Sequence, residues 1–116
     1  MHEMSIALDI LNIVEKTAQT NGATVVKDIY VDVGALAGVM IPSLEFGLEI
    51  AKRDTCARQT AIHVQEIKGR GRCPTCGGTF PMGFYIEPCP RCDDSYLSMV
   101  AGDELRVREI EVEQAA

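Results

Sequence analysis

Two pairs of cysteines constrain this 116-residue chain more than any other feature. CPTC at 73–76 and CPRC at 89–92 give the spacing C-x2-C-x12-C-x2-C, which is typical of a zinc ribbon. Two residues between thiolates let one turn present both sulfurs to a single ion, with backbone N–H groups directed at the sulfur charge. We therefore predict one zinc site. Its ligands are Cys73, Cys76, Cys89 and Cys92.

Four cysteine ligands leave no open coordination position, so this metal is predicted to be structural and not catalytic. The insert that carries the cysteines has little apolar content and should need its metal to fold. Two alternatives remain open at this point. The same ligands suit a rubredoxin-like iron site, and a close cysteine pair can also act in redox chemistry.

Hydrophobic periodicity predicts an α+β fold in which two helices pack on one face of a three-stranded sheet. The cysteine insert comes before the last strand, whose apolar positions change parity, so we expect a β-bulge near Arg108-Glu109. The predicted helices are 3–19 and one that opens at Pro42-Ser43, and the predicted strands are 25–34, 61–68 and 103–113. We expect two domains: an α+β domain of residues 1–69 plus 99–116, and an inserted zinc-binding domain of residues 70–98.

Composition excludes several classes of function. The formal net charge of −6 would repel a phosphate backbone, and the absence of Trp leaves little material for base stacking, so no nucleic-acid partner is expected. Apolar runs are too short to span a membrane, and no secretory signal is evident. We expect a cytoplasmic protein, whose cysteines favour metal over disulfides. The sequence also has no catalytic residue set and no phosphate-binding Gly-rich loop, so an enzyme is not expected.

The N-terminus MHE offers a second set of metal ligands. The amine of Met1, the amide nitrogen of His2 and its imidazole can close fused chelate rings around one ion, and planar nitrogen donors suit Ni²⁺ or Cu²⁺. A bulky second residue keeps Met1 in place. Glu3 could add its amide nitrogen or its carboxylate. By itself this pattern is weak, because a terminal histidine is usually exposed and idle.

The MHE terminus, the small α+β body and the late CPTC and CPRC motifs together resemble the hydrogenase nickel-incorporation proteins, the HypA/HybF family. The resemblance runs over the whole chain, from MHEMSIALDILNIVE through PSLEFGLE to the last strand. It implies a nickel metallochaperone for maturation of [NiFe] hydrogenase, with Ni(II) as transported cargo and Zn(II) as a structural ion. His2 matches the nickel ligand, and the four cysteines match the zinc ligands.

The resemblance also implies partners: a HypB-type GTPase and the large subunit of [NiFe] hydrogenase. A homodimer through a sheet edge is a further expectation, and urease is another conceivable recipient of the nickel. Further nickel ligands are not identified, and Glu3, Asp32, Met40 and His63 are spatial candidates only. The main alternative to the whole interpretation is a zinc-ribbon adaptor with no nickel role.

Overall fold

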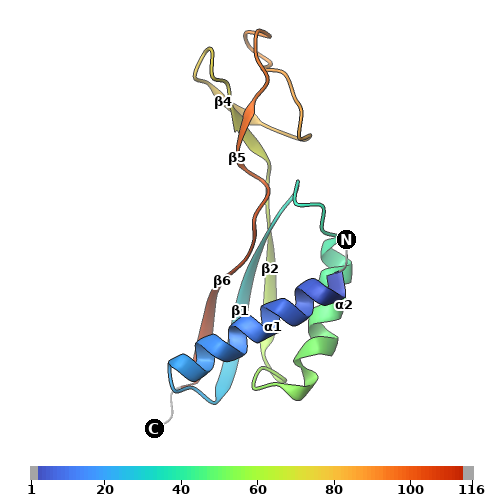
Figure 1. Ribbon diagram of the computed structural model, residues 1–116, viewed down its shortest axis with the longest axis vertical. Coiled ribbons are helices and arrows are strands. Elements are labelled where there is room, and N and C mark those ends of the chain that lie inside the picture. Colours follow the sequence, from blue (N-terminus) through green and yellow to red (C-terminus); the bar gives the residue numbers. More distant parts are fainter. Residues whose placement is uncertain (1–2, 114–116) are drawn as a thin grey trace. The chain divides into compact units, whose positions relative to one another are not determined.

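The computed structural model describes residues 3–113 of the chain, and Figure 1 shows the order of its elements. The helices are α1 (Glu3–Thr20), α2 (Ile41–Ala51) and the short 3-10 helix η1 (Lys52–Asp54). The strands are β1 (Val25–Gly34), β2 (Ala61–Ile67), β3 (Arg70–Arg72), β4 (Thr79–Pro81), β5 (Ser98–Ala101) and β6 (Leu105–Glu113). They form two sheets of three strands each.

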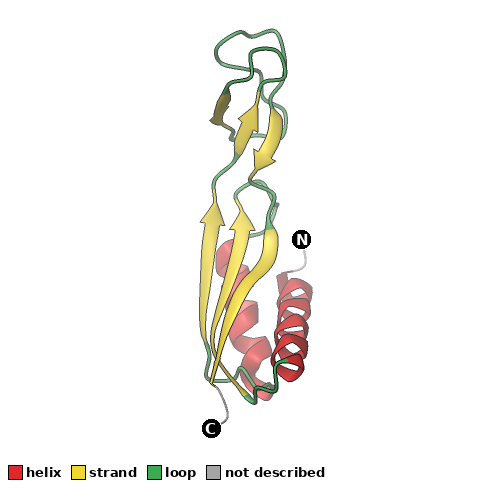
Figure 2. Ribbon diagram, turned by 90° about the vertical axis from the view of Figure 1, so that its left-hand side faces the viewer, coloured by secondary structure: helices red, strands yellow, loops and turns green. Residues whose placement is uncertain are grey.

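The larger sheet has the order β2-β1-β6, and both long helices lie on one of its faces (Figure 2). Its core combines the inward face of β1 with one side of each helix, because alternate residues of a strand point to the same face. The fully buried members include Ile29, Val31, Leu44, Leu48 and Val14. Apolar burial of this kind is the main stabilising contribution to such a layer.

The two helices approach each other closely at Gly47 of α2. A Cβ atom placed there would lie 3.3 Å from the Cβ of Ala7 and 3.4 Å from the Sδ of Met4 on α1. Glycine normally weakens a helix interior. Here its missing side chain lets α1 come near.

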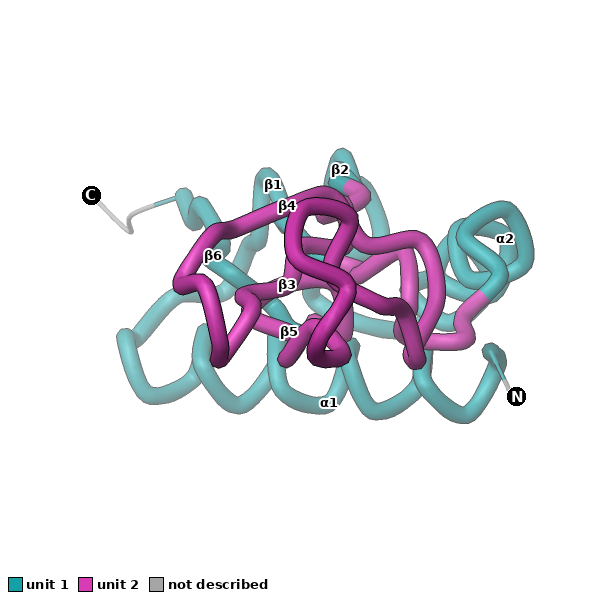
Figure 3. The backbone as a smooth tube through the Cα atoms, turned by 90° about the horizontal axis from the view of Figure 1, so that it is seen from above, with its two compact units in different colours: residues 1–32, 40–65, 106–116 teal, residues 33–39, 66–105 magenta. Residues whose placement is uncertain are grey.

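The chain divides into two compact units, which Figure 3 colours separately. The first contains residues up to 32, 40–65 and from 106 onward, and the second contains 33–39 and 66–105. The second unit holds the small antiparallel sheet β4-β3-β5 and a core of its own. That core is built from Cys73, Met82, Cys89 and Leu97, against which Leu36, Phe80 and Met99 pack.

The predicted fold class is confirmed: two helices cover a three-stranded sheet, and the four-cysteine insert precedes the last strand. The second sheet was not predicted, because its strands have only three or four residues and leave no periodic signal. In β6 the half-buried positions are Val107, Ile110 and Val112, so burial changes parity where the bulge was expected; the bulge itself stays a prediction. Within residues 3–113, no helix is long and apolar enough to cross a bilayer.

Leu48→Ala should lower the free energy of unfolding of the first unit by about 2–4 kcal/mol, because it removes a fully buried side chain and leaves a cavity. The matched control is Leu8→Ala on α1, where the leucine is 53% exposed and the loss should stay within about 0.5 kcal/mol. Urea unfolding followed by helical circular dichroism measures both. Equal losses in the two variants would contradict the described core.

Candidate metal centre

The four cysteines of the insert converge on one point. Their Sγ atoms all lie within 4.8 Å of one another, with Cys73 Sγ 3.6 Å from Cys92 Sγ and Cys76 Sγ 3.7 Å from Cys89 Sγ. Four thiolates bound tetrahedrally at roughly 2.3 Å from one zinc ion would be about 3.8 Å apart. The donor set therefore fits a tetrahedral Zn²⁺. Because four-coordinate zinc would have all its positions filled by these sulfurs, no position would remain open for another ligand.

Each cysteine pair lies on a tight turn with the same backbone pattern. In the first turn Gly77 N–H donates to Cys73 O at 2.8 Å and Cys73 N–H donates to Gly78 O at 2.9 Å. In the second turn Asp93 N–H likewise donates to Cys89 O at 3.1 Å, and Cys89 N–H donates to Ser95 O at 2.9 Å, one residue farther along than in the first turn. These bonds set the spacing of the two sulfurs within each pair.

The residue after each second cysteine takes a left-handed backbone conformation. Gly77 has φ 75° and Asp93 has φ 58°. Glycine adopts this conformation without strain, and aspartate is among the few other residues that tolerate it. The role of Asp93 was not predicted from the sequence, although superposing CPTCG on CPRCD would have indicated it.

Backbone amides prepare the sulfur atoms for negative charge. The N–H groups of Cys76 and Cys92 donate to Cys73 Sγ at 3.4 Å and to Cys89 Sγ at 3.5 Å. The amide of Cys92 is the main reason why the pKa of Cys89 is lowered to about 6, and the amide of Gly78 and then Arg91 lower the pKa of Cys76. Both thiols therefore lose their protons more readily than an isolated cysteine does.

The fourth thiol behaves differently. The pKa of Cys92 is raised to about 12: the Asp94 amide lowers it, but burial and hydrogen bonds with Cys73 and Cys89 outweigh that amide. Charges that are this close cannot all form without a cation between them. A divalent ion supplies the missing positive charge, so this electrostatic pattern also fits a metal centre.

Arg91 is the arginine that the structure places at this centre. Its Nη2 donates to the carbonyl oxygen of Cys76 at 3.2 Å, and its guanidinium lies 5.6 Å from the centroid of the Phe80 ring. The pKa of Arg91 is raised, mainly by its hydrogen bond with Cys76. A fixed cation beside four thiolates offsets part of their excess negative charge.

The predicted nickel ligand His2 lies outside the described residues, but the chain next to it is anchored. Glu3 Oε2 accepts a hydrogen bond from the backbone N–H of Met40 at 3.2 Å, which ties the start of α1 to the residue before α2. The carboxylate of Glu3 thus already has a partner. The Met40 side chain itself is 66% exposed.

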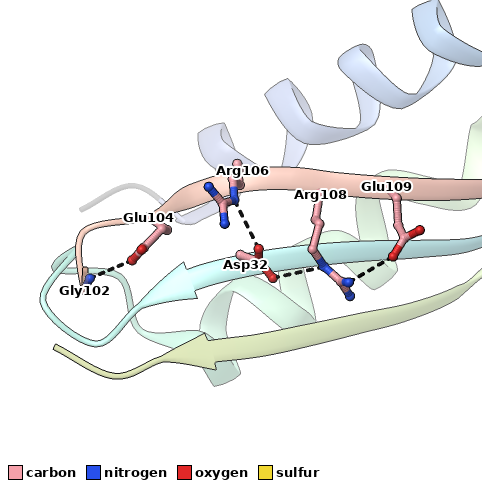
Figure 4. A network of polar contacts seen from close by, with 6 residues as sticks. All are labelled: Asp32, Gly102, Glu104, Arg106, Arg108 and Glu109. Carbon is pink, nitrogen blue, oxygen red and sulfur yellow. Dashed lines mark hydrogen bonds and ion pairs between the residues drawn. The ribbon is translucent and has the colours of Figure 1, made fainter. Parts of the chain in front are cut away.

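Asp32, another candidate ligand, is engaged elsewhere. It is buried in β1 and forms ion pairs with Arg106 Nε at 3.1 Å and Arg108 Nε at 3.4 Å, both from β6 (Figure 4). A buried carboxylate needs such partners, because an unpaired one would be costly. Asp32 therefore ties β1 to β6 in this structure.

His63 is the last of the nickel-ligand candidates, and Cys56 is the one cysteine outside the two pairs. His63 Nε2 is 2.9 Å from Asp28 Oδ1, and its ring stacks on Tyr30 with centroids 4.7 Å apart, so it is a satisfied surface histidine. Cys56 is a free, half-buried thiol. Burial is the main reason why the pKa of Cys56 is raised, so it is a poor nucleophile.

Comparison with known proteins identifies the family. A family described as "Hydrogenase/urease nickel incorporation, metallochaperone, hypA" matches residues 1–112. The chain belongs to the HypA family. A relative named "Hydrogenase maturation factor HypA" from Geobacter metallireducens is 40% identical, covering 97% of this chain and 100% of the relative. Another with that name, from Parabacteroides distasonis, is 38% identical over 98% of this chain and 99% of its own.

Solved structures support the fold of this HypA family member. The solution structure of the Ni metallochaperone HypA from Helicobacter pylori aligns with a TM-score of 0.70 at 19% identity, covering 97% of both chains. A second structure, titled "Solution structure of HypA protein", aligns with a TM-score of 0.73 at 20% identity, again over 97% of both chains. At these identities the likeness concerns the fold alone.

Gly77→Ala should weaken zinc binding by about 1 kcal/mol, or roughly fivefold in affinity, because an L-residue is strained at this positive φ. Space is not the reason, since the nearest atom to an added Cβ would be 3.9 Å away. Competition with a zinc chelator measures the change.

The matched control for Gly77 is Gly83→Ala in the same unit. Its φ is not positive, and the nearest atom to its Cβ would be 3.8 Å away, so affinity should be unchanged. An equal loss in both variants would show that the backbone conformation is not the cause.

Cys89→Ser should abolish zinc binding and unfold the second unit, because Cys89 is both a metal donor and a buried core residue. Both long helices belong to the first unit and should keep their circular dichroism signal. Cys56→Ser is the matched control and should retain zinc. Elemental analysis and amide exchange check the result, and retention of zinc by Cys89→Ser would refute the four-sulfur site.

Proposed function

We propose that this protein binds Ni²⁺ at its N-terminus and delivers it during maturation of [NiFe] hydrogenase, while Zn²⁺ is held by Cys73, Cys76, Cys89 and Cys92. The observation that carries this proposal is membership of the HypA family through a match that begins at residue 1. The relatives are named hydrogenase maturation factors. The N-terminal ligand set is therefore part of the matched sequence.

The zinc site supports a model in which the resident metal and the transported metal bind at different sites. Among residues 3–113, no group of three or more His, Cys, Asp or Glu side chains other than the four cysteines is positioned to hold a metal. The enclosed cysteine site suits a resident ion and offers no open position for exchange. A transported ion thus needs different donors, and Met1 and His2 supply nitrogen ligands that suit Ni²⁺.

The hydrogen bond between Glu3 and Met40 supports assignment of nickel binding to the first unit, because Glu3 follows the proposed nickel ligands directly in the sequence. Residues 1–69 plus 99–116 would then form the nickel-binding domain, and residues 70–98 the inserted zinc-binding domain. Release of nickel follows from ligand exchange, since nitrogen donors at a terminus can be replaced one at a time by those of the recipient. No bond of a substrate is made or broken, so we expect no enzymatic activity.

The same proposal includes the setting and the partners. We expect the protein to act in the cytoplasm with a HypB-type GTPase and the hydrogenase large subunit. The edge strands β2 and β6 could also pair with a second copy of the chain. The chemistry of the nickel site is the part of the proposal that can be tested most directly.

His2→Gln should abolish nickel binding and leave about one zinc per chain, because it removes the imidazole but keeps a bulky second residue that retains Met1. His63→Gln is the matched control, since His63 is the other histidine and already pairs with Asp28. Calorimetric titration of Ni²⁺ into untagged, zinc-loaded protein measures both variants.

An N-terminal extension gives an independent arm of this experiment, because it converts the Met1 amine into an amide. Nickel binding that survives both the extension and His2→Gln would rule out the terminal site. If the native chain binds zinc but no nickel, the zinc-ribbon adaptor becomes the better explanation. A visible colour in the purified protein would instead indicate iron at the four cysteines.

A further inference from the structure

The second unit displays three consecutive large apolar side chains to solvent. Phe84, Tyr85 and Ile86 are 72%, 62% and 74% exposed, and they lie together on the connection between β4 and the second cysteine turn. Single exposed apolar residues are common on protein surfaces. A contiguous group of this size usually marks an interaction site.

These side chains are not part of the core of their own unit. That core is already formed by Cys73, Met82, Cys89 and Leu97 with the residues packed around them, including the aromatic ring of Phe80. The unit thus partly buries Phe80 and leaves Phe84 exposed a few residues later. Stability of the fold does not explain why the exposed positions are apolar.

Backbone contacts hold this apolar turn in one shape. Gly83 N–H donates to Glu87 Oε1 at 3.2 Å, and Leu97 N–H donates to Glu87 O at 2.8 Å. Met82, just before the turn, donates its N–H to Gly69 O at 2.9 Å. Both ends are therefore fixed, and Cys89 follows shortly after. An apolar turn that is ordered in advance loses little conformational entropy when it binds.

An acidic recess of about 410 Å³ begins at Pro88, two residues after Ile86 in the chain. It is lined by Pro88, Asp93, Asp94, Ser95 and Tyr96, and Pro88 pairs with Tyr96 through a β-bridge. Tyr96 adds another exposed ring, at 65%. Two carboxylates beside aromatic groups would attract a Lys or Arg side chain and repel phosphate groups of lipids or nucleic acids.

We propose that Phe84–Ile86 and this acidic recess form a docking surface for a protein that presents apolar side chains flanked by Lys or Arg. The zinc centre holds the surface in shape, since Cys89 lies between the turn and Asp93. One unit would then recruit the partner protein and the other would carry the nickel. The inference rests on the proposed function only in the choice of partner proteins for the test.

The test compares full-length, zinc-loaded native protein with Phe84→Ser/Ile86→Ser. The probes are the hydrogenase large-subunit precursor and the HypB-type GTPase of the same organism, with binding measured by calorimetry at low and high salt. Affinity for at least one probe should fall at least about tenfold, as expected when central apolar contacts are lost. Val100→Ser is the matched control, since Val100 is 59% exposed on β5 of the same unit, and its affinity should be unchanged.

Asp93→Asn/Asp94→Asn tests the recess, because it removes the charge and keeps the shape and the left-handed conformation. It should weaken binding and reduce the dependence of affinity on salt. Zinc content and nickel stoichiometry, measured on every variant, should stay at native values. Loss of zinc from a turn variant would mean that the turn belongs to the fold and would overturn the proposal.

The remaining outcomes decide whether the docking surface exists and what occupies it. Equal binding of native protein and Phe84→Ser/Ile86→Ser to both probes would overturn the docking surface while leaving the proposed nickel function intact. Self-association that disappears in the double variant would make a second copy the occupant, and binding only to neutral lipid vesicles would make it a membrane. Failure of the native chain to bind nickel would defeat the proposed function, yet docking would still be measured separately.

Discussion

The convergence of four cysteine sulfurs is the interaction on which the second unit depends. Cys73 and Cys89 are buried core residues as well as metal donors, so the same atoms complete the apolar core and the ligand set. Neighbouring thiolates repel one another. A cation bound between them cancels this repulsion, and its bonds to the four sulfurs cross-link the two cysteine turns. A small unit with a short sheet gains in this way the stability that its limited apolar core cannot provide.

The sequence predicted the first unit well because its elements are long and periodic. The helix from Glu3 and the strand at 25–34 follow from the spacing of their apolar residues. In the second unit, only the cysteine cluster was predicted in the same way, from the spacing of the four cysteines. Even in the first unit, the buried stripe of α1 is shifted: Met4 and Leu8 fit the apolar period but lie 41% and 53% exposed. The part of the apolar stripe of α1 that is buried depends on where α2 packs against it. Periodicity within α1 cannot predict that position.

The parts that could not be predicted depend on contacts between distant segments. The strands β3, β4 and β5 are too short for a pattern, and they exist because Gly71 pairs with both Phe80 and Met99. The ion pairs of Asp32 with two arginines of β6 join residues 74 positions or more apart. In the candidate site, spacing identified the four sulfurs, whereas the contact of Arg91 with Phe80 required coordinates.

The left-handed conformation of Asp93 implies an order of assembly at the zinc centre. A glycine turn reaches its final shape freely in the unfolded chain, whereas an aspartate turn reaches it less often. The Cys73–Cys76 pair would therefore capture the ion first, and the Cys89–Cys92 pair would close the site. Disassembly would begin at the closing side, with the Cys89–Cys92 pair. The two similar turns would thus have different roles: the first would bind the ion, and the second would complete its coordination.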